Sequence, residues 1–142
     1  RLVDARNRQT SVGDRAFAYC NQLESVSLPD GLDSIGRAAF YACEQLAGIV
    51  IPSGVTALRE ETFSYCCALE SVALPDILQT IDDYAFAACS ALRELAVPAS
   101  VEHIDGGAFN DTPDITLLVE KDSYAHKYAG ENGIRYILLP GA

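Results

Sequence analysis

The amino-acid sequence predicts a right-handed, β-rich solenoid of about six stacked rungs, with a parallel β-sheet along one face and a capping helix and strand at its C-terminal end. Two observations predict this fold: large residues recur at fixed positions of a repeating unit, and the apolar residues between them keep the same register. The recurring residues, each 23 positions after its predecessor, are Phe17, Phe40, Phe63, Phe86 and Phe109; Cys20, Cys43, Cys66 and Cys89; and Pro29, Pro52, Pro75 and Pro98.

Apolar columns repeat with the same period and without an insertion. They are Val12, Ile35, Leu58, Ile81 and Ile104; Leu23, Leu46, Leu69, Leu92 and Ile115; Val26, Ile49, Val72, Leu95 and Leu118; Leu28, Ile51, Leu74 and Val97; and Leu32, Val55, Leu78 and Val101. One rung is too short to bury its own apolar side chains, whereas stacked rungs cover one another. Burial between rungs is therefore expected to dominate the stability of the fold.

Each rung is expected to contain one short strand that ends at a proline. Apolar and polar side chains alternate at the end of residues 23–28, so that Val26 and Leu28 share a face. Pro29 ends the strand because it has no amide hydrogen to donate. Copies of this strand are expected to stack in parallel about 4.8 Å apart. A second extended piece ends at Ile35, and a tight turn or a short 3₁₀ or helical segment follows it.

The sequence predicts a single domain over residues 1–142, with a partial N-terminal rung (1–11), the repeats (12–115) and a C-terminal cap (116–142). Val3 stands one period before Val26, so the chain is expected to begin within the strand of an incomplete rung. The sequence contains no methionine, and we expect it to be a fragment or processed form of a longer protein with further rungs upstream.

The repeat weakens after Phe109. Thr112 stands in the cysteine column, and Leu118 stands one period after Leu95. The same spacing puts Glu120 in the column of Leu28, where a carboxylate would replace an apolar side chain.

The C-terminal cap has the signals of a helix followed by a strand. Asp122 or Ser123 can cap a helix over residues 124–132, which Gly133 would end. Residues 134–139 are expected to form a final strand. These elements would cover the apolar side of the last rung.

The composition excludes some classes of partner. The net charge is −10, and an acidic surface repels the phosphates of nucleic acids and of anionic lipids. No apolar run reaches the roughly 18 residues that span a bilayer. The polar N-terminal segment lacks the apolar stretch of a signal peptide. We expect neither nucleic-acid binding nor direct membrane insertion.

The cysteine column suggests structural thiols rather than a metal or disulfide set. Zinc sites bring ligands together in closely spaced pairs on turns, whereas here one cysteine per rung stacks above the next. Parallel side chains are also poorly placed for a disulfide. The column is expected to be buried, and the adjacent Cys67 to face outward or into the turn, where it is the candidate for intermolecular pairing.

No catalytic, metal or cofactor site is predicted. His103 and His126 stand one period apart and could form a metal pair, but two solvated histidines is the favoured interpretation. Stacked carboxylates could bind calcium, but Arg37 and Arg59 interrupt them, which favours a solvated charged edge. The acidic residues in question are Glu60, Glu61, Asp82, Asp83 and Asp105. Neither histidine can be placed with a serine or cysteine nucleophile and an aspartate as a catalytic triad, so an enzyme is not expected.

The repeating unit resembles the BspA-like leucine-rich repeats, also called the Treponema pallidum type. The matching residues are Ile35-Gly36, Ala39-Phe40, Cys43, Leu46, Ile49, Ile51-Pro52 and their copies in the other rungs. The resemblance covers residues 12–109, and residues 124–133 resemble the usual C-terminal ending of such domains. It implies a leucine-rich-repeat solenoid in a secreted or surface-attached protein, mainly of bacteria living with animal hosts, and a role in adhesion. It carries over no functional residue, because the repeat consensus is structural.

The outward face of the strands holds the candidate partner-binding residues. These positions are mostly small, and a flat ledge of small residues lets another chain approach closely. The candidates are Ser25, Ser27, Gly48, Val50, Ser71, Ala73, Glu94 and Ala96, with Leu117 and Val119 in the last rung. The alternative is that small residues merely suit a curved inner face or pack against a neighbouring molecule.

The sequence thus predicts a non-catalytic protein- or glycan-binding module of a surface or secreted protein, acting in adhesion or host interaction, with proteins of the host extracellular matrix among the candidate ligands. The alternative is a structural spacer without a ligand of its own. The expected location is extracellular or on the cell surface. Five cysteines without a disulfide pattern fit an anaerobic or cytosolic setting more easily than an oxidising one, so the alternative location is cytoplasmic.

Overall fold

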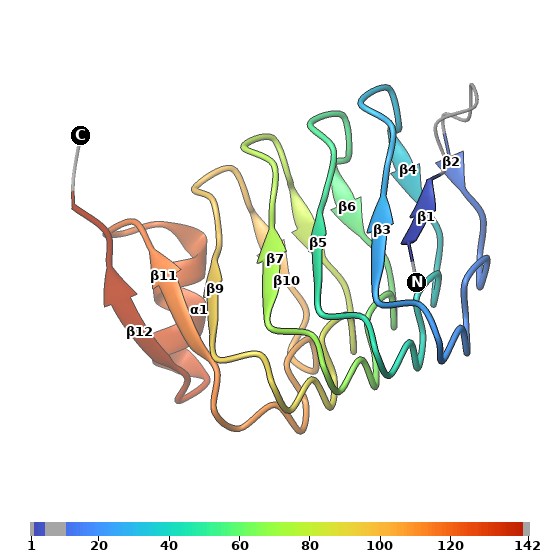
Figure 1. Cartoon of the computed structure of the whole chain (residues 1–142). Helices are drawn as coiled ribbons and strands as arrows, with labels where there is room; N and C mark the ends of the chain where they lie inside the picture. The colour runs from blue at the N-terminus through green and yellow to red at the C-terminus, as the bar shows by residue number, and fades with distance from the viewer. Residues whose placement is uncertain (1, 5–10, 141–142) are drawn as a thin grey trace.

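In the computed structural model, which describes residues 2–4 and 11–140, the chain winds into a solenoid with β-strands on two sides and turns along a third (Figure 1). One side carries β1 (Leu2–Asp4), β3 (Ser25–Ser27), β5 (Gly48–Val50), β7 (Ser71–Ala73), β9 (Glu94–Ala96), β11 (Thr116–Val119) and β12 (Arg135–Leu138). The other carries β2 (Ser11–Val12), β4 (Ser34–Ile35), β6 (Ala57–Leu58), β8 (Thr80–Ile81) and β10 (His103–Ile104). The helix is α1 (Tyr124–Glu131). We call the first side the sheet face.

The strand pairs of the described residues are parallel, and their register follows the predicted period over most of the chain. Val3 pairs with Val26, as the repeat predicts. Residues 5–10, which belong to the predicted partial N-terminal rung, lie outside the described residues. Copies of the same short strand stack at the same height because a proline stops each of them at the same place.

The last rung departs from the predicted register by one residue. Leu95 pairs with Leu117, and Ala96 with Leu118. Leu117 and Val119 are fully buried, whereas Glu120 is exposed.

The prediction that Leu118 continues an inward column was therefore wrong, as was the outward placement of Leu117 and Val119. Strict periodic spacing would bury the carboxylate of Glu120, which is costly, and a one-residue slip turns every side chain of a strand to the opposite face.

A ladder of phenylalanine rings runs through the core. Ring centroids of successive members lie 5.3, 5.5, 5.6 and 5.5 Å apart, and the rings are within 16° of parallel. Phe40, Phe63 and Phe86 are completely buried. Each such side chain contributes about 1.5–3 kcal/mol through burial, and offset stacking adds to it.

The turns that carry these rings are non-helical and hold up to two residues with left-handed backbone in each rung. The residues are Arg15 and Tyr19; Ala38 and Ala42; Glu61 and Tyr65; Tyr84 and Ala88; and Asp111, with φ between 52° and 63°. Left-handed backbone costs a non-glycine residue about 1–2 kcal/mol. It is maintained because it directs the N–H groups of the turn to the carbonyls of the next rung, as Tyr65 N does to Ala87 O at 2.8 Å.

The cysteine column is buried as predicted, except that Cys20 in the first complete turn is half-buried. Each inner thiol donates to a phenylalanine carbonyl of the preceding rung: Cys43 Sγ to Phe17 O at 3.0 Å, Cys66 Sγ to Phe40 O and Cys89 Sγ to Phe63 O, both at 3.1 Å. Thr112 repeats the interaction, with Oγ1 donating to Phe86 O at 2.6 Å. All five cysteines are free thiols.

The C-terminal cap matches the prediction to within one or two residues. Ser123 caps α1, its Oγ accepting from His126 N at 3.2 Å, and Gly133 follows the helix with φ +68°. Tyr128 is buried and donates through its hydroxyl to Asp105 O at 2.9 Å, so α1 covers part of the last rung. Figure 1 shows β12 at the edge of the sheet beyond β11, and its four side chains are exposed.

No helix among the described residues combines the length and the apolar character that crossing a membrane requires.

Candidate partner-binding surfaces

The predicted ledge residues lie on the outer side of β3, β5, β7 and β9. Gly48 is half-buried and the other seven are exposed, because side chains alternate along each strand and the inward positions between them are apolar. Val50 has 69% of its surface exposed, a large fraction for a β-branched apolar residue in a strand.

The structure brings five of the eight ledge residues together around one hollow of about 510 Å³, the sheet-face hollow. These five are Ser27, Gly48, Val50, Ser71 and Ala73; Ser25, Glu94 and Ala96 do not line it. The remaining lining residues are Val26, Leu28, Asp30, Ile49, Pro52 and Val72.

Local sequence explains why the hollow forms here. Gly48 is part of its lining, and a Cβ atom at that position would meet Ser71 Oγ at 2.8 Å, so only glycine lets the neighbouring serine keep its place. The strand ladder is also interrupted on both sides of the β5–β7 pair, because β3 pairs with β1 and β9 pairs with β11. Leu28, which follows β3, and Val72, in β7, remain only partly buried beside these interruptions.

The chemistry of the sheet-face hollow suits recognition of a mainly apolar surface. Most of its lining is aliphatic, the hydroxyls of Ser27 and Ser71 can donate or accept hydrogen bonds, and Asp30 is the one ionisable residue in the lining. Sites of this kind combine apolar walls with a few polar groups that fix orientation.

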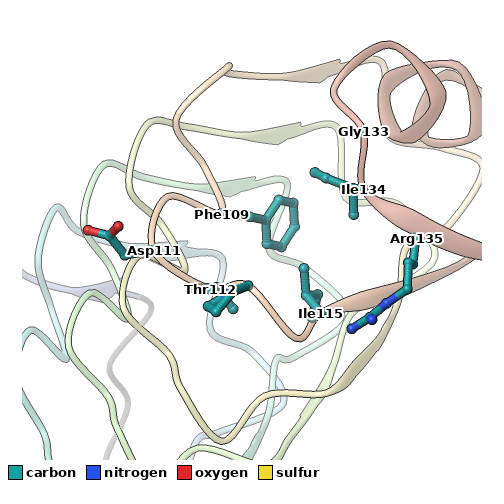
Figure 2. A pocket seen from close by; sticks show the side chains of 8 residues that line it. Phe109, Asp111, Thr112, Ile115, Gly133, Ile134 and Arg135 are labelled. Carbon is teal, nitrogen blue, oxygen red and sulfur yellow. The ribbon is translucent and has the colours of Figure 1, made fainter.

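A second hollow, the end pocket, lies where the repeats stop. It has a volume of about 610 Å³. Its lining residues are Phe109, Asp111, Thr112, Pro113, Ile115, Gly133, Ile134 and Arg135. Figure 2 shows the Phe109 ring, Ile115 and Ile134 converging on it, with Arg135 entering from β12.

Sequence reasoning missed the end pocket because a repeat pattern reports where rungs are alike, and this pocket arises where the next rung is absent. The available signal was the end of the phenylalanine column, since Asn132 stands one period after Phe109.

The histidines are not brought together. His103 lies at hydrogen-bond distance from Asp105, whereas His126 accepts from Asp122 N at 2.9 Å and its ring is 4.8 Å from that of Tyr136. No three His, Cys, Asp or Glu side chains in the described part of the chain are grouped closely enough to hold a metal ion.

The acidic columns serve structural contacts. Glu60 forms an ion pair with Arg37 at 3.1 Å, and Asp83 Oδ1 accepts from Gly107 N at 3.0 Å. Burial and the neighbouring carboxylate of Asp105 raise the pKa of Asp82.

Burial also determines the state of the thiols. It raises the pKa of Cys43 to about 11 and that of Cys89 to about 12, so both remain protonated donors near neutral pH. Cys67 is exposed, as predicted for the candidate in intermolecular pairing. Whether it pairs stays a prediction.

Residues 7–126 match the protein family described as BspA type leucine rich repeat region, in six copies, and the chain belongs to this family. Among curated proteins, no relative matches the sequence significantly.

Solved structures resemble the chain in fold and sequence. The leucine rich repeat protein of T. pallidum is 32% identical, covers 82% of this chain and has a TM-score of 0.79. A leucine rich cell surface protein from Faecalibacterium prausnitzii is 31% identical, covers 99% of this chain and has a TM-score of 0.82. A leucine-rich repeat protein from Bacteroides ovatus is 30% identical, covers 83% and has a TM-score of 0.75.

The chain spans only part of these proteins: 57% of the T. pallidum protein, 36% of the F. prausnitzii protein and 33% of the B. ovatus protein.

Proposed function

We propose that this chain is a non-catalytic, protein-binding module of a bacterial cell-surface or secreted protein, and that it binds an extended segment of its partner on the sheet face. The observation that carries the proposal is the sheet-face hollow, an aliphatic depression on a surface of otherwise small side chains. Solenoids commonly bind through such extended surfaces.

The similarity to the F. prausnitzii cell surface protein over 99% of the chain supports the location. A role in adhesion follows from the combination of a surface location with a binding face. In this proposal, proteins of the host extracellular matrix are candidate partners.

The expected mode of binding follows from the lining. An apolar side chain of the partner enters the hollow beside Val50, which loses most of its exposed surface, and Ser27 and Ser71 hydrogen-bond to the main chain of the partner. Full burial of one large apolar side chain contributes about 1.5–3 kcal/mol, so a few such contacts give a measurable affinity.

The test is a binding screen of the purified chain against immobilised matrix proteins and mucins, at low and at physiological salt. We expect saturable binding that persists at physiological salt, because apolar contacts are not screened, and that the double variant Ser27→Glu, Ala73→Glu abolishes. Binding that disappears with salt would instead reflect the acidic surface acting non-specifically.

The matched control is the double variant Gln45→Glu, Ser90→Glu, which adds the same charge at exposed positions outside the lining of the hollow. It should bind like the unmodified chain. Equal loss of binding in both double variants, or binding to no partner in the screen, would refute the proposed function.

A further inference from the structure

The turns of the solenoid are joined by a repeated pair of main-chain hydrogen bonds. In four successive rungs, the N–H of the phenylalanine and the N–H two positions later donate to two carbonyls of the next rung that are themselves two positions apart. Phe17 N donates to Ala39 O at 2.8 Å, and Tyr19 N donates to Tyr41 O at 2.7 Å. The same pair occurs in the three following rungs, ending with Phe86 N and Ala88 N.

The last rung leaves this pair of donors unused. Within the part of the chain that the structure describes, the N–H groups of Phe109 and Asp111 have no hydrogen-bond partner. Asp111 has the same left-handed backbone as Ala88, so its N–H points, as in the earlier rungs, toward the place of a following rung. That place is the end pocket, which both residues line. Main-chain donors of buried residues are nearly always paired, and Phe109 is buried, so its N–H in particular calls for a partner, whereas Asp111 is exposed.

The rest of the pocket provides an apolar floor and a positive charge. Ile115 is buried, and Ile134 packs against the core cluster from the cap side. Arg135 is the one cationic residue of the lining, in a chain with a net charge of −10. Figure 2 shows the Asp111 carboxylate on the far side of the turn from Arg135. The lining thus offers the main-chain N–H groups of Phe109 and Asp111 together with the guanidinium group of Arg135.

We propose that the end pocket binds an extended peptide segment of a partner protein. Two main-chain carbonyls of this segment, two positions apart, accept the N–H groups of Phe109 and Asp111. The apolar side chain between them contacts Phe109, Ile115 and Ile134, and an acidic side chain pairs with Arg135. This site is separate from the sheet-face hollow and does not depend on it.

The spacing of the donors selects a peptide over other ligands. In four successive rungs the same two donors are matched by carbonyls at positions i and i+2 of a polypeptide, with the side chain of i+1 directed into the core. Adding a segment to unpaired main-chain groups is a general mode of peptide recognition, in which the main chain provides affinity and side-chain pockets provide specificity.

The probe is a synthetic peptide with the sequence of residues 108–114, in which an alanine and an asparagine flank a phenylalanine and two aspartates follow it. Within the fold, the carbonyls of Ala108 and Asn110 accept from the rung before them, so the peptide has the chemistry of an added turn. Its acidic residues are on the C-terminal side of the phenylalanine, the side on which Arg135 lies beside Thr116. Titration into the ¹⁵N-labelled chain, followed by amide NMR, should shift the Phe109 and Asp111 amide protons downfield. The amides of Phe63 and Tyr65, whose hydrogen bonds are already formed, serve as internal controls and should not move.

The variant Arg135→Glu, at an exposed position, should weaken binding of this peptide roughly threefold or more, as expected for loss of an exposed ion pair. Arg93→Glu makes the same charge change at an exposed position outside the pocket and should leave binding unaltered.

Three outcomes would overturn the proposal. The first is that the Phe109 and Asp111 amides do not shift at millimolar peptide. The second is that shifts are confined to the sheet face around Gly48. The third is that the same amides shift with protein concentration alone, which would assign the pocket to a second copy of the chain.

Discussion

The residues with left-handed backbone in the turns lead to a prediction opposite to the usual rule, according to which replacing alanine by glycine destabilises a fold. Ala88 has φ 55°, whereas its neighbour Ala87 has no positive φ and is 5% exposed. We predict that Ala88→Gly leaves the stability almost unchanged or slightly raised, and that Ala87→Gly, its matched control, destabilises the fold.

The magnitudes follow from three effects. Glycine relieves about 1–2 kcal/mol of left-handed strain at position 88, but it loses about 0.5–1 kcal/mol through greater chain entropy and a few tenths through a half-buried methyl group. The net change in stability is between about −0.3 and about +1.2 kcal/mol, centred near about +0.5 kcal/mol. At position 87 there is no strain to relieve, so the entropy and a fully buried methyl group together cost about 1.5 kcal/mol.

Urea denaturation followed by circular dichroism measures both variants. We expect the free energy of unfolding to fall with urea concentration at the same slope in both variants, and the urea midpoint to fall only for Ala87→Gly. Equal destabilisation by the two substitutions would refute the assignment of strain to the turn.

Three further predictions concern the thiols and the acidic column. Cys89→Thr should be nearly neutral, because the threonine hydroxyl can make the bond that Thr112 makes. Cys89→Val removes that bond but leaves Phe63 O accepting from Cys66 N, so it should lower the urea midpoint by the equivalent of about 0.5–1.5 kcal/mol. Iodoacetamide at pH 8 should modify Cys67 well before Cys66, which is buried and has a raised pKa; mass mapping that finds equal rates would contradict this. The raised pKa of Asp82 means that its ionised form opposes folding above the folded-state pKa and that this effect is absent below the unfolded value of 3.8. Asp82→Asn should therefore stabilise the chain at pH 7 and lose that advantage near pH 3, and a pH-independent difference in thermal midpoint would argue against it.

The repeat architecture could be predicted from the sequence because each column reports one position of one rung. The register of the last rung could not. Residues 115–119 read Ile-Thr-Leu-Leu-Val, and this run offers apolar side chains to either face of a strand. In the observed register Val119 is buried rather than Glu120. This register depends on pairing with the neighbouring strand and not on the local sequence pattern.

The turns were also beyond sequence reasoning. Left-handed backbone is usually signalled by glycine or asparagine, yet residues such as Tyr65 and Glu61 adopt it here. Hydrogen bonds between rungs impose the conformation, and these depend on stacking. In the same way, the sequence identified the small residues of the ledge, but the hollow around Gly48 depends on how the rungs stack, with the strand ladder interrupted on both sides of the β5–β7 pair.

The central claim is that the sheet-face hollow is the docking surface of this module. Amide hydrogen exchange of the chain, alone and with the tightest-binding protein from the matrix and mucin screen, tests it most directly. The account predicts protection on binding within residues 26–30, 48–52 and 71–73, the segments that line the hollow. Protection confined to the turns or to the β8 and β10 side, with the sheet face unchanged, would contradict it.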